Sequence, residues 1–145
     1  MFLSSHLANL VELSINDVER DRALQHFIDW LLAALVGLRL NVGHRVATLT
    51  ERNRSNGDIT IVGIGNCDVM TALIHNSALG NAAKLDDYHR LSVTHPGPIV
   101  IPVAFATAQR ENRDIQEFLN GIVVGYKGYD SNGNGCGRRP LPPVA

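Results

Sequence analysis

"DIQEFLNGIVVGY", residues 114–126, decides the fold class, because its apolar side chains recur at positions i, i+3, i+4 and i+7. This period places them on one face of an α-helix. Asp114 and Glu117 have the spacing of a capping box, in which Asp114 caps the helix and Glu117 binds back to the cap. The stretch therefore predicts a helix with one buried face, made of Ile115, Phe118, Leu119, Ile122, Val123 and Tyr126.

Three further segments upstream favour helices. Residues 3–13 fit a short one, and "SIND" then offers Ser14 or Asn16 as the cap of a longer one. The second half of that longer helix is apolar almost all round, which predicts a central position in the fold. Within it we expect Asp29 to pair with an arginine or to accept backbone amides, since an unpaired buried carboxylate is costly. Residues 43–54 fit a third helix. The apolar positions expected on the central helix are Leu24, Phe27, Ile28, Leu31, Leu35 and Leu38.

The middle of the chain predicts one short strand followed by a helix. "DITIVG" alternates β-branched residues, and Asp68 after "GIGNC" fits a helix N-cap rather than a dinucleotide loop. The following helix, residues 69–83, is rich in small residues that allow neighbouring helices to approach. His75 and Asn76 on it are expected to be hydrogen-bonded core polar groups, with a cavity-facing position as the alternative.

"PGPIVIPVAFATAQREN" fits a buried helix whose first turn tolerates Pro98 and whose regular part begins near Pro102. From Gly128 onward the sequence is dense in glycine, asparagine and proline without periodicity, which is typical of a disordered tail. We therefore expect a mainly α protein, a helical bundle with at most one short strand. Residues 1–127 form its helical domain, and residues 128–145 form the tail.

Composition excludes several classes of function. The 145 residues are 45% hydrophobic and 19% charged, with a net charge of -1, so no basic surface for nucleic acid is expected. Cys67 and Cys136 have neither zinc-ligand nor disulfide-framework spacing. The N-terminus lacks the basic start of a signal peptide, and the most apolar run, "FIDWLLAALVGL", is too short to span a membrane. A cytoplasmic location is expected.

"KLDDYHRLSVTHPGP", residues 84–98, concentrates the candidate chemistry. Carboxylates and imidazoles held together can divide the roles of general base and general acid, because their neighbours separate their pKa values. A polar loop between two helices explains the same residues without catalysis, and Asp86, Asp87, His89 and His95 are also competent metal ligands. Hydroxyl donors and groups that could orient a substrate carboxylate are Tyr88, Thr94, Lys84, His89, His95 and Arg90.

"ALGNAAKLDDYHRLSVTHPGPIVIPVAFATAQ", residues 78–109, resembles the signature region of the MmgE/PrpD family. This family includes 2-methylcitrate dehydratases, cis-aconitate decarboxylases and iminodisuccinate epimerases. Its signature has a small-residue helix, paired acids, a His-Pro step about eight residues later, and an apolar helix. The likeness extends from Leu7 to Lys127 through "HFIDWLLAALVG", "ITIVGIGN" and "FLNGIVVGYK".

The resemblance implies a large helical domain whose polar loop forms one wall of an active site. Family members remove a proton next to a carboxylate of a small di- or tricarboxylic acid, and then lose water, lose CO2 or reprotonate. It implies no metal or organic cofactor, and a homo-oligomer is expected. By motif, Asp86, Asp87 and His95 are the candidate catalytic residues: His95 transfers a proton or binds a substrate carboxylate, and an acid orients it. The candidate substrate-binding residues are Lys84, Tyr88, His89 and Thr94.

Two departures from the family pattern affect this expectation. Lys84 stands where the family has the first acid of its signature, which reverses the charge there. The chain is also about a third as long as family members, so it fits an N-terminal fragment of such a lyase, which need not be active alone. The alternatives are an epimerase of the same family and a non-catalytic helical module that self-associates.

Overall fold

The computed structural model describes residues 14–90 and 93–135, and for residues 129–135 it describes the backbone only. Within these residues the fold is mainly α-helical, which confirms the predicted fold class. The prediction of at most one short strand was wrong, because residues 65–67 turn back and pair with residues 59–61 in a two-stranded antiparallel hairpin. The expected helix at residues 3–13 lies outside the described residues. The elements are α2 (Asp17–Gly37), α3 (Asn41–Asn53), β1 (Ile59–Ile61), β2 (Gly65–Cys67), α4 (Val69–Ala82), α5 (Gly97–Arg110) and α6 (Ile115–Gly135).

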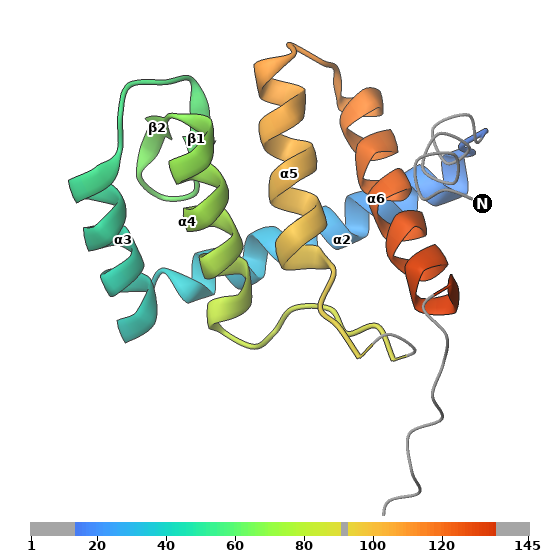
Figure 1. The fold of residues 1–145 in the computed structure, drawn as a ribbon, viewed down its shortest axis with the longest axis horizontal. Coiled ribbons are helices and arrows are strands. Elements are labelled where there is room, and N and C mark those ends of the chain that lie inside the picture. The colour runs from blue at the N-terminus through green and yellow to red at the C-terminus, as the bar shows by residue number, and fades with distance from the viewer. Residues whose placement is uncertain (1–13, 91–92, 136–145) are drawn as a thin grey trace, which may run out of the picture.

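The central position predicted for the second helix is confirmed by α2, which runs behind α4, α5 and α6 (Figure 1). Asn16 caps α2 with a complete capping box: its side chain accepts from the Glu19 N–H, and the Glu19 carboxylate accepts from the Asn16 N–H. No single helix in the described part of the chain is long and apolar enough to cross a membrane. Only α2 and α3 together, bent by 89° at their junction, reach that length and composition.

The buried face of α2 differs from the predicted one. Leu24, Ile28 and Leu35 are exposed, whereas Ala33 and Ala34 are buried. The reason is close packing on α4, since a Cβ added at Gly37 would lie 2.5 Å from the Leu79 carbonyl oxygen. Small side chains allow this approach, so α2 buries its alanines together with Trp30 and turns Leu24, Ile28 and Leu35 outward. Phe27, Leu31 and Leu38 are partly buried against the core, as expected.

Asp29 is exposed, so the expected pairing of a buried carboxylate does not apply to it. The predicted core role of the two polar residues on α4 is confirmed. His75 Nδ1 lies 2.8 Å from the Thr50 hydroxyl. Asn76 accepts from the Val62 N–H and donates to the Thr60 carbonyl, and so binds α4 to the hairpin. Asp68 caps α4 through the Thr71 N–H, as predicted.

Helices α5 and α6 depart from the prediction at three points. Helix α5 begins at Gly97, so Pro102 lies inside it rather than at its regular start. Asp114 accepts from the Glu117 N–H, but the Glu117 carboxylate binds Arg113 at 3.1 Å instead of returning to the cap. Helix α6 also continues past Gly128 to residue 135. Extending an existing helix costs much less than nucleating one, which explains how it passes a segment of poor helix formers.

Candidate functional site

The connection between α4 and α5 carries the predicted site residues. His89 and Thr94 form a β-bridge, in which the His89 N–H donates to the Thr94 carbonyl at 2.8 Å and the Thr94 N–H donates back at 3.4 Å. The bridge folds the connection back on itself and brings residue 95 alongside residues 86 and 87. Residues 91–92, at the tip, lie outside the described part. The connection ends at Pro96, directly before α5 begins at Gly97.

Both oxygens of the Asp87 carboxylate accept hydrogen bonds from other elements. Oδ1 accepts from the Gly97 N–H at 2.9 Å, and Oδ2 accepts from the Tyr126 hydroxyl on α6 at 2.8 Å. A Cβ at Gly97 would lie 2.4 Å from Oδ1, so only glycine permits this approach. Asp87 therefore binds the loop to the start of α5 and to the side of α6.

Asp86 is the buried acid of the pair, with a side chain only 1% exposed. Among the described residues, no hydrogen-bond donor points at either of its oxygens. The His95 ring lies beside it, with Nδ1 3.0 Å from Oδ2. A buried carboxylate with so few donors is costly. The contact between Asp86 and His95 therefore contributes to the energetics of both side chains.

The His95 ring has its two nitrogens in different surroundings. Nδ1 lies 2.8 Å from the Asp87 carbonyl oxygen and 3.0 Å from Asp86 Oδ2. A carbonyl oxygen can only accept, so Nδ1 must carry the proton. In the neutral ring, Nε2 then has the free lone pair. The side chain is 45% exposed, so a molecule from solvent can reach it.

The remaining predicted residues surround this cluster less closely. Tyr88 is exposed, with its ring centroid 5.3 Å from that of His95. Lys84 has a left-handed backbone with φ of 54°, and its ammonium donates to Asn81 Oδ1 at 2.7 Å. His89 and Thr94 form the bridge described above, and Arg90 is exposed. The structure thus brings Asp86, Asp87, His95 and Tyr88 together and places Lys84 at the end of α4.

A narrow hollow beside the two acids is too small to hold a water molecule. His95 contacts Asp86 but does not line this hollow. Among the described residues, no group of three or more histidines, cysteines and acids is placed to hold a metal ion. The residues that line the hollow are His26, Asp29, Trp30, Asp86, Asp87, Gly97 and Pro98.

Tyr126 and His26 are part of this site, although the sequence pointed to neither. Burial raises the pKa of Tyr126, and the Asp87 carboxylate raises it further because the phenol donates to it. The His26 ring stacks on Tyr126 with centroids 4.7 Å apart. The one signal in the sequence was a hydroxyl at the last position of an otherwise apolar stripe, since a buried tyrosine hydroxyl requires a partner.

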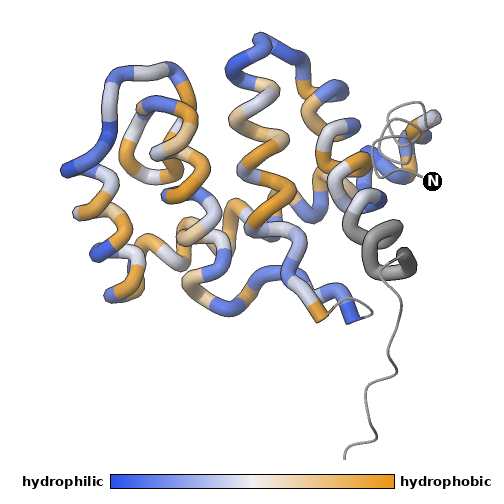
Figure 2. Tube along the Cα trace, viewed as in Figure 1, coloured by the Kyte–Doolittle hydropathy of each residue, from blue (hydrophilic) through white to orange (hydrophobic). Residues whose placement is uncertain are grey.

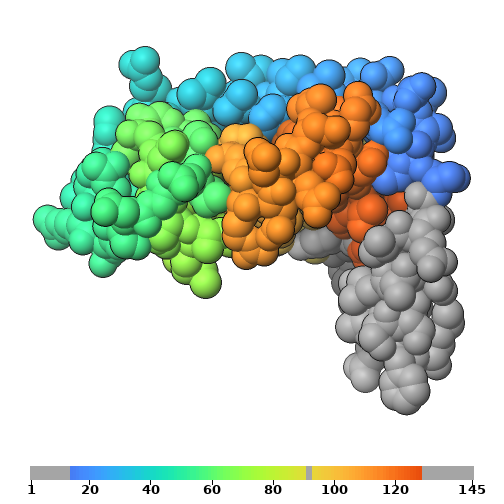
Figure 3. Space-filling view, turned by 90° about the horizontal axis from the view of Figure 1, so that it is seen from above, coloured from blue at the N-terminus to red at the C-terminus, as the bar shows by residue number. Residues whose placement is uncertain are grey.

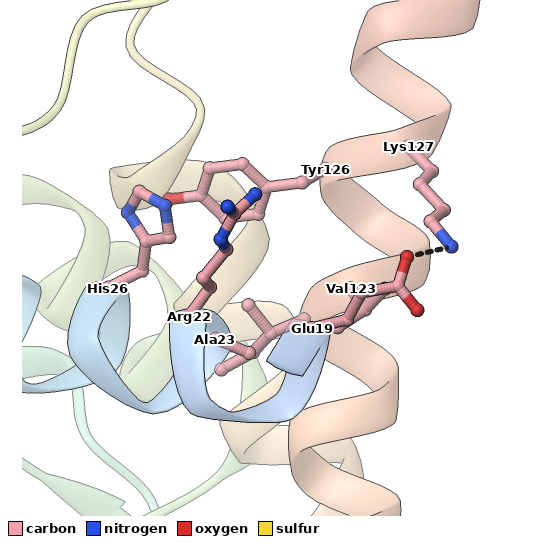
Figure 4. A pocket seen from close by; sticks show the side chains of 8 residues that line it. Glu19, Arg22, Ala23, His26, Val123, Tyr126 and Lys127 are labelled. Carbon is pink, nitrogen blue, oxygen red and sulfur yellow. Dashed lines mark ion pairs between the residues drawn. The ribbon is translucent and has the colours of Figure 1, made fainter. Parts of the chain in front are cut away.

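A groove of about 250 Å³ between α2 and α6 continues from this region (Figure 4). His26 lines both the groove and the hollow beside the acids. Lys127 binds Glu19 at 2.7 Å across the groove. This ion pair joins the beginning of α2 to α6, so the two helices that support Asp87 and His26 are held together.

Fold and loop together define a mainly helical domain with an acidic, histidine-containing connection between two of its helices. The chain belongs to the MmgE/PrpD family, whose N-terminal domain matches residues 3–127. Among curated relatives, the cis-aconitate decarboxylase-like protein oryM of Aspergillus oryzae is 26% identical over 137 residues, 86% of this chain and 28% of that protein. Cis-aconitate decarboxylase of Aspergillus terreus is 30% identical over 101 residues, 67% of this chain and 21% of that protein.

The chain spans about a quarter of the length of these relatives. No solved structure matches it.

Proposed function

We propose that this chain provides the acid-base residues of a lyase that acts on small di- or tricarboxylic acids. The observation that carries the proposal is the position of the proton on the His95 ring. Nδ1 donates to the Asp87 carbonyl, and the Asp86 carboxylate lies beside it. This arrangement leaves Nε2 with the free lone pair, on a side chain that is 45% exposed. Membership of the MmgE/PrpD family and relatives named as cis-aconitate decarboxylases support this class of reaction.

In the proposed reaction, His95 Nε2 takes a proton from the carbon next to a substrate carboxylate. The C–H electron pair moves into the substrate, and either hydroxide leaves and is protonated to water, or a C–C bond breaks and CO2 leaves. In the second case the C–H and C–C electron pairs both remain on the substrate, so its carbons take two protons, the one held by the imidazolium and one from solvent. The names of the relatives favour loss of CO2 over loss of water.

Asp86 and Asp87 have different roles in this proposal. The Asp86 carboxylate, 3.0 Å from Nδ1, stabilises the imidazolium that forms when Nε2 takes the proton. Asp87 fixes the position of the loop, because both of its oxygens bind Gly97 and Tyr126. Tyr88, His89, Thr94 and Lys84 are proposed to contact the substrate. We also propose that the protein works in the cytoplasm, without a cofactor and as a homo-oligomer.

The test is proton exchange and turnover, followed by NMR with cis-aconitate and 2-methylcitrate in D2O. Proton removal next to a carboxylate gives deuterium incorporation even where the later step is slow. We expect His95→Gln to lower the exchange rate by roughly 100-fold or more, and Asp86→Asn to lower it by a smaller factor. His44→Gln, which changes an exposed histidine on α3, is the matched control. Exchange equal to that in buffer, or unchanged in His95→Gln, would contradict the proposal.

A further inference from the structure

Helix α2 carries two polar side chains, Arg22 and His26, that have no polar partner within the described part of the chain. Arg22 is exposed and forms neither an ion pair nor a hydrogen bond with another described residue. The half-buried His26 ring stacks on Tyr126, but its nitrogens form no hydrogen bond there. A spacing of four residues places both side chains on one face of the helix. Unused hydrogen-bond donors are therefore collected at one place on α2.

Both side chains line the groove between α2 and α6. Figure 3 shows the beginning of α2 beside α6, and in Figure 2 hydrophilic residues predominate over this part of α2. Figure 4 shows Arg22 and His26 rising from the same side of α2. The other side of the groove is apolar and buried, and consists of Ala23, Ile122 and Val123. The groove thus combines free donors with an apolar floor.

The remaining charged residues of the groove balance each other. Glu19 and Lys127 form an ion pair at 2.7 Å, and the Glu19 carboxylate also accepts from the Asn16 N–H at 3.0 Å. The two acids of the loop line the neighbouring hollow and not the groove. Because a guanidinium stays protonated at all ordinary pH values, Arg22 leaves the groove with one unbalanced positive charge.

This combination fits a small organic anion with one carboxylate. A guanidinium with free N–H groups binds a planar carboxylate through two parallel hydrogen bonds. The His26 imidazole can donate one further bond to the same group. The apolar floor favours a ligand with a carbon chain over a bare inorganic ion. The groove, about 250 Å³, lies below the roughly 300–1,000 Å³ of pockets for drug-sized ligands, so the ligand must be small.

We propose that the groove between α2 and α6 is a binding site for a small aliphatic carboxylic acid. Its carboxylate binds Arg22 and His26, and its carbon chain lies over Ala23 and Val123. His95 is not among the residues that line the groove. The site is therefore separate from the proposed acid-base residues and does not depend on the proposed catalysis.

Tyr126 connects this site with the loop between α4 and α5. It lines the groove, its ring stacks on His26 with centroids 4.7 Å apart, and its hydroxyl donates to Asp87 at 2.8 Å. An acid bound to His26 thus lies against the residue that holds the loop. Since a ligand that binds only the folded chain stabilises it, occupancy of the groove supports the arrangement of the loop.

The experiment is an NMR titration of the full chain with butyrate at constant ionic strength. The Arg22 Nε–H signal and the Val123 methyl signals report on the two sides of the groove. We expect both to shift with one saturable curve and a dissociation constant in the millimolar range, as is usual for a ligand of few atoms. Propylamine has the same carbon chain without the carboxylate, and inorganic phosphate has the negative charge without the chain. Each should bind at least about tenfold more weakly than butyrate.

Three variants separate this site from other cationic groups. Arg22→Gln should raise the dissociation constant of butyrate by about 10-fold or more, because it removes the bonds to the charged group. Arg39→Gln, at an exposed arginine beyond the other end of α2, is the matched control and should leave the constant unchanged. His95→Gln should also leave it unchanged, because His95 lies outside the groove. No saturable shift at Arg22, equal affinity in Arg22→Gln, loss of binding in His95→Gln, or phosphate binding as tight as that of butyrate would overturn the proposal.

Discussion

Replacing Tyr126 by phenylalanine tests how the loop between α4 and α5 is held in place. The change removes the hydroxyl that donates to Asp87 Oδ2 at 2.8 Å and leaves the ring that stacks on His26. A hydrogen bond to a charged group contributes about 1.5–3 kcal/mol. Both partners are half-buried. We therefore expect a loss of about 2 kcal/mol in the free energy of unfolding, which lowers the urea midpoint by about 1 M.

A double-mutant cycle shows whether the loss comes from this contact. In an Asp87→Ala background the acceptor is already absent, so Tyr126→Phe should then cost less than about 0.5 kcal/mol. The assay is urea unfolding followed by circular dichroism for all four chains. An equal cost of Tyr126→Phe in both backgrounds would refute the reasoning, because the hydroxyl would then act through some other contact.

The same contact predicts a pH dependence. The pKa of Tyr126 is raised above the ordinary value of 10.0 in the folded chain, so folding favours the protonated phenol. Its contribution to stability is fully present below about pH 10 and is lost as the pH rises above that value. The stability difference between the unaltered chain and Tyr126→Phe should therefore shrink between about pH 9 and pH 11. A constant difference across that range would contradict this prediction.

Three further predictions concern the core. Gly80→Ala should destabilise the fold by about 2 kcal/mol or more, because its Cβ would lie 2.3 Å from Nε1 of the buried Trp30. In the same urea assay Gly121→Ala, whose Cβ would lie 3.6 Å from its nearest neighbour, should be neutral or stabilising. Asn76→Ala should cost about 2–4 kcal/mol, since it leaves a backbone N–H and a carbonyl of the hairpin region unpaired; a cost below about 1 kcal/mol would contradict this. Burial lowers the pKa of His75 below 6.5, so the contribution of the neutral ring to the free energy of unfolding is present above that pH and is lost as the pH falls below it. His75→Asn should reduce this pH dependence, measured as the free energy of unfolding between about pH 7 and pH 5.

The helices were largely predictable from the sequence, because apolar periodicity and cap residues are local signals. Helix α4 ends within one residue of the prediction, and its cap is the predicted Asp68. The inward face of α2 was not predictable. When a helix is apolar on most sides, periodicity does not show which side the neighbouring helices approach, and here the small residues decided it.

The acids and histidine of the site were predictable as a group, because they lie within ten residues on one connection. Their separate roles were not. The difference between Asp86 and Asp87 depends on Tyr126, which is 39 residues beyond Asp87 and reaches it only through the packing of α6 on α5. A contact between a loop and a distant helix leaves no periodic signal in the sequence.

The central claim is that the His95 ring is held with its proton on Nδ1, so that Nε2 is the base. Two-dimensional NMR that correlates the imidazole nitrogens and protons of the 15N-labelled chain measures this directly. The measurement belongs at about pH 8, above the ordinary histidine pKa of about 6.5. The account predicts a protonated Nδ1 and an unprotonated Nε2, and the same preference in Asp86→Asn, because the Asp87 carbonyl still accepts from Nδ1. A neutral ring that carries its proton on Nε2 would contradict it.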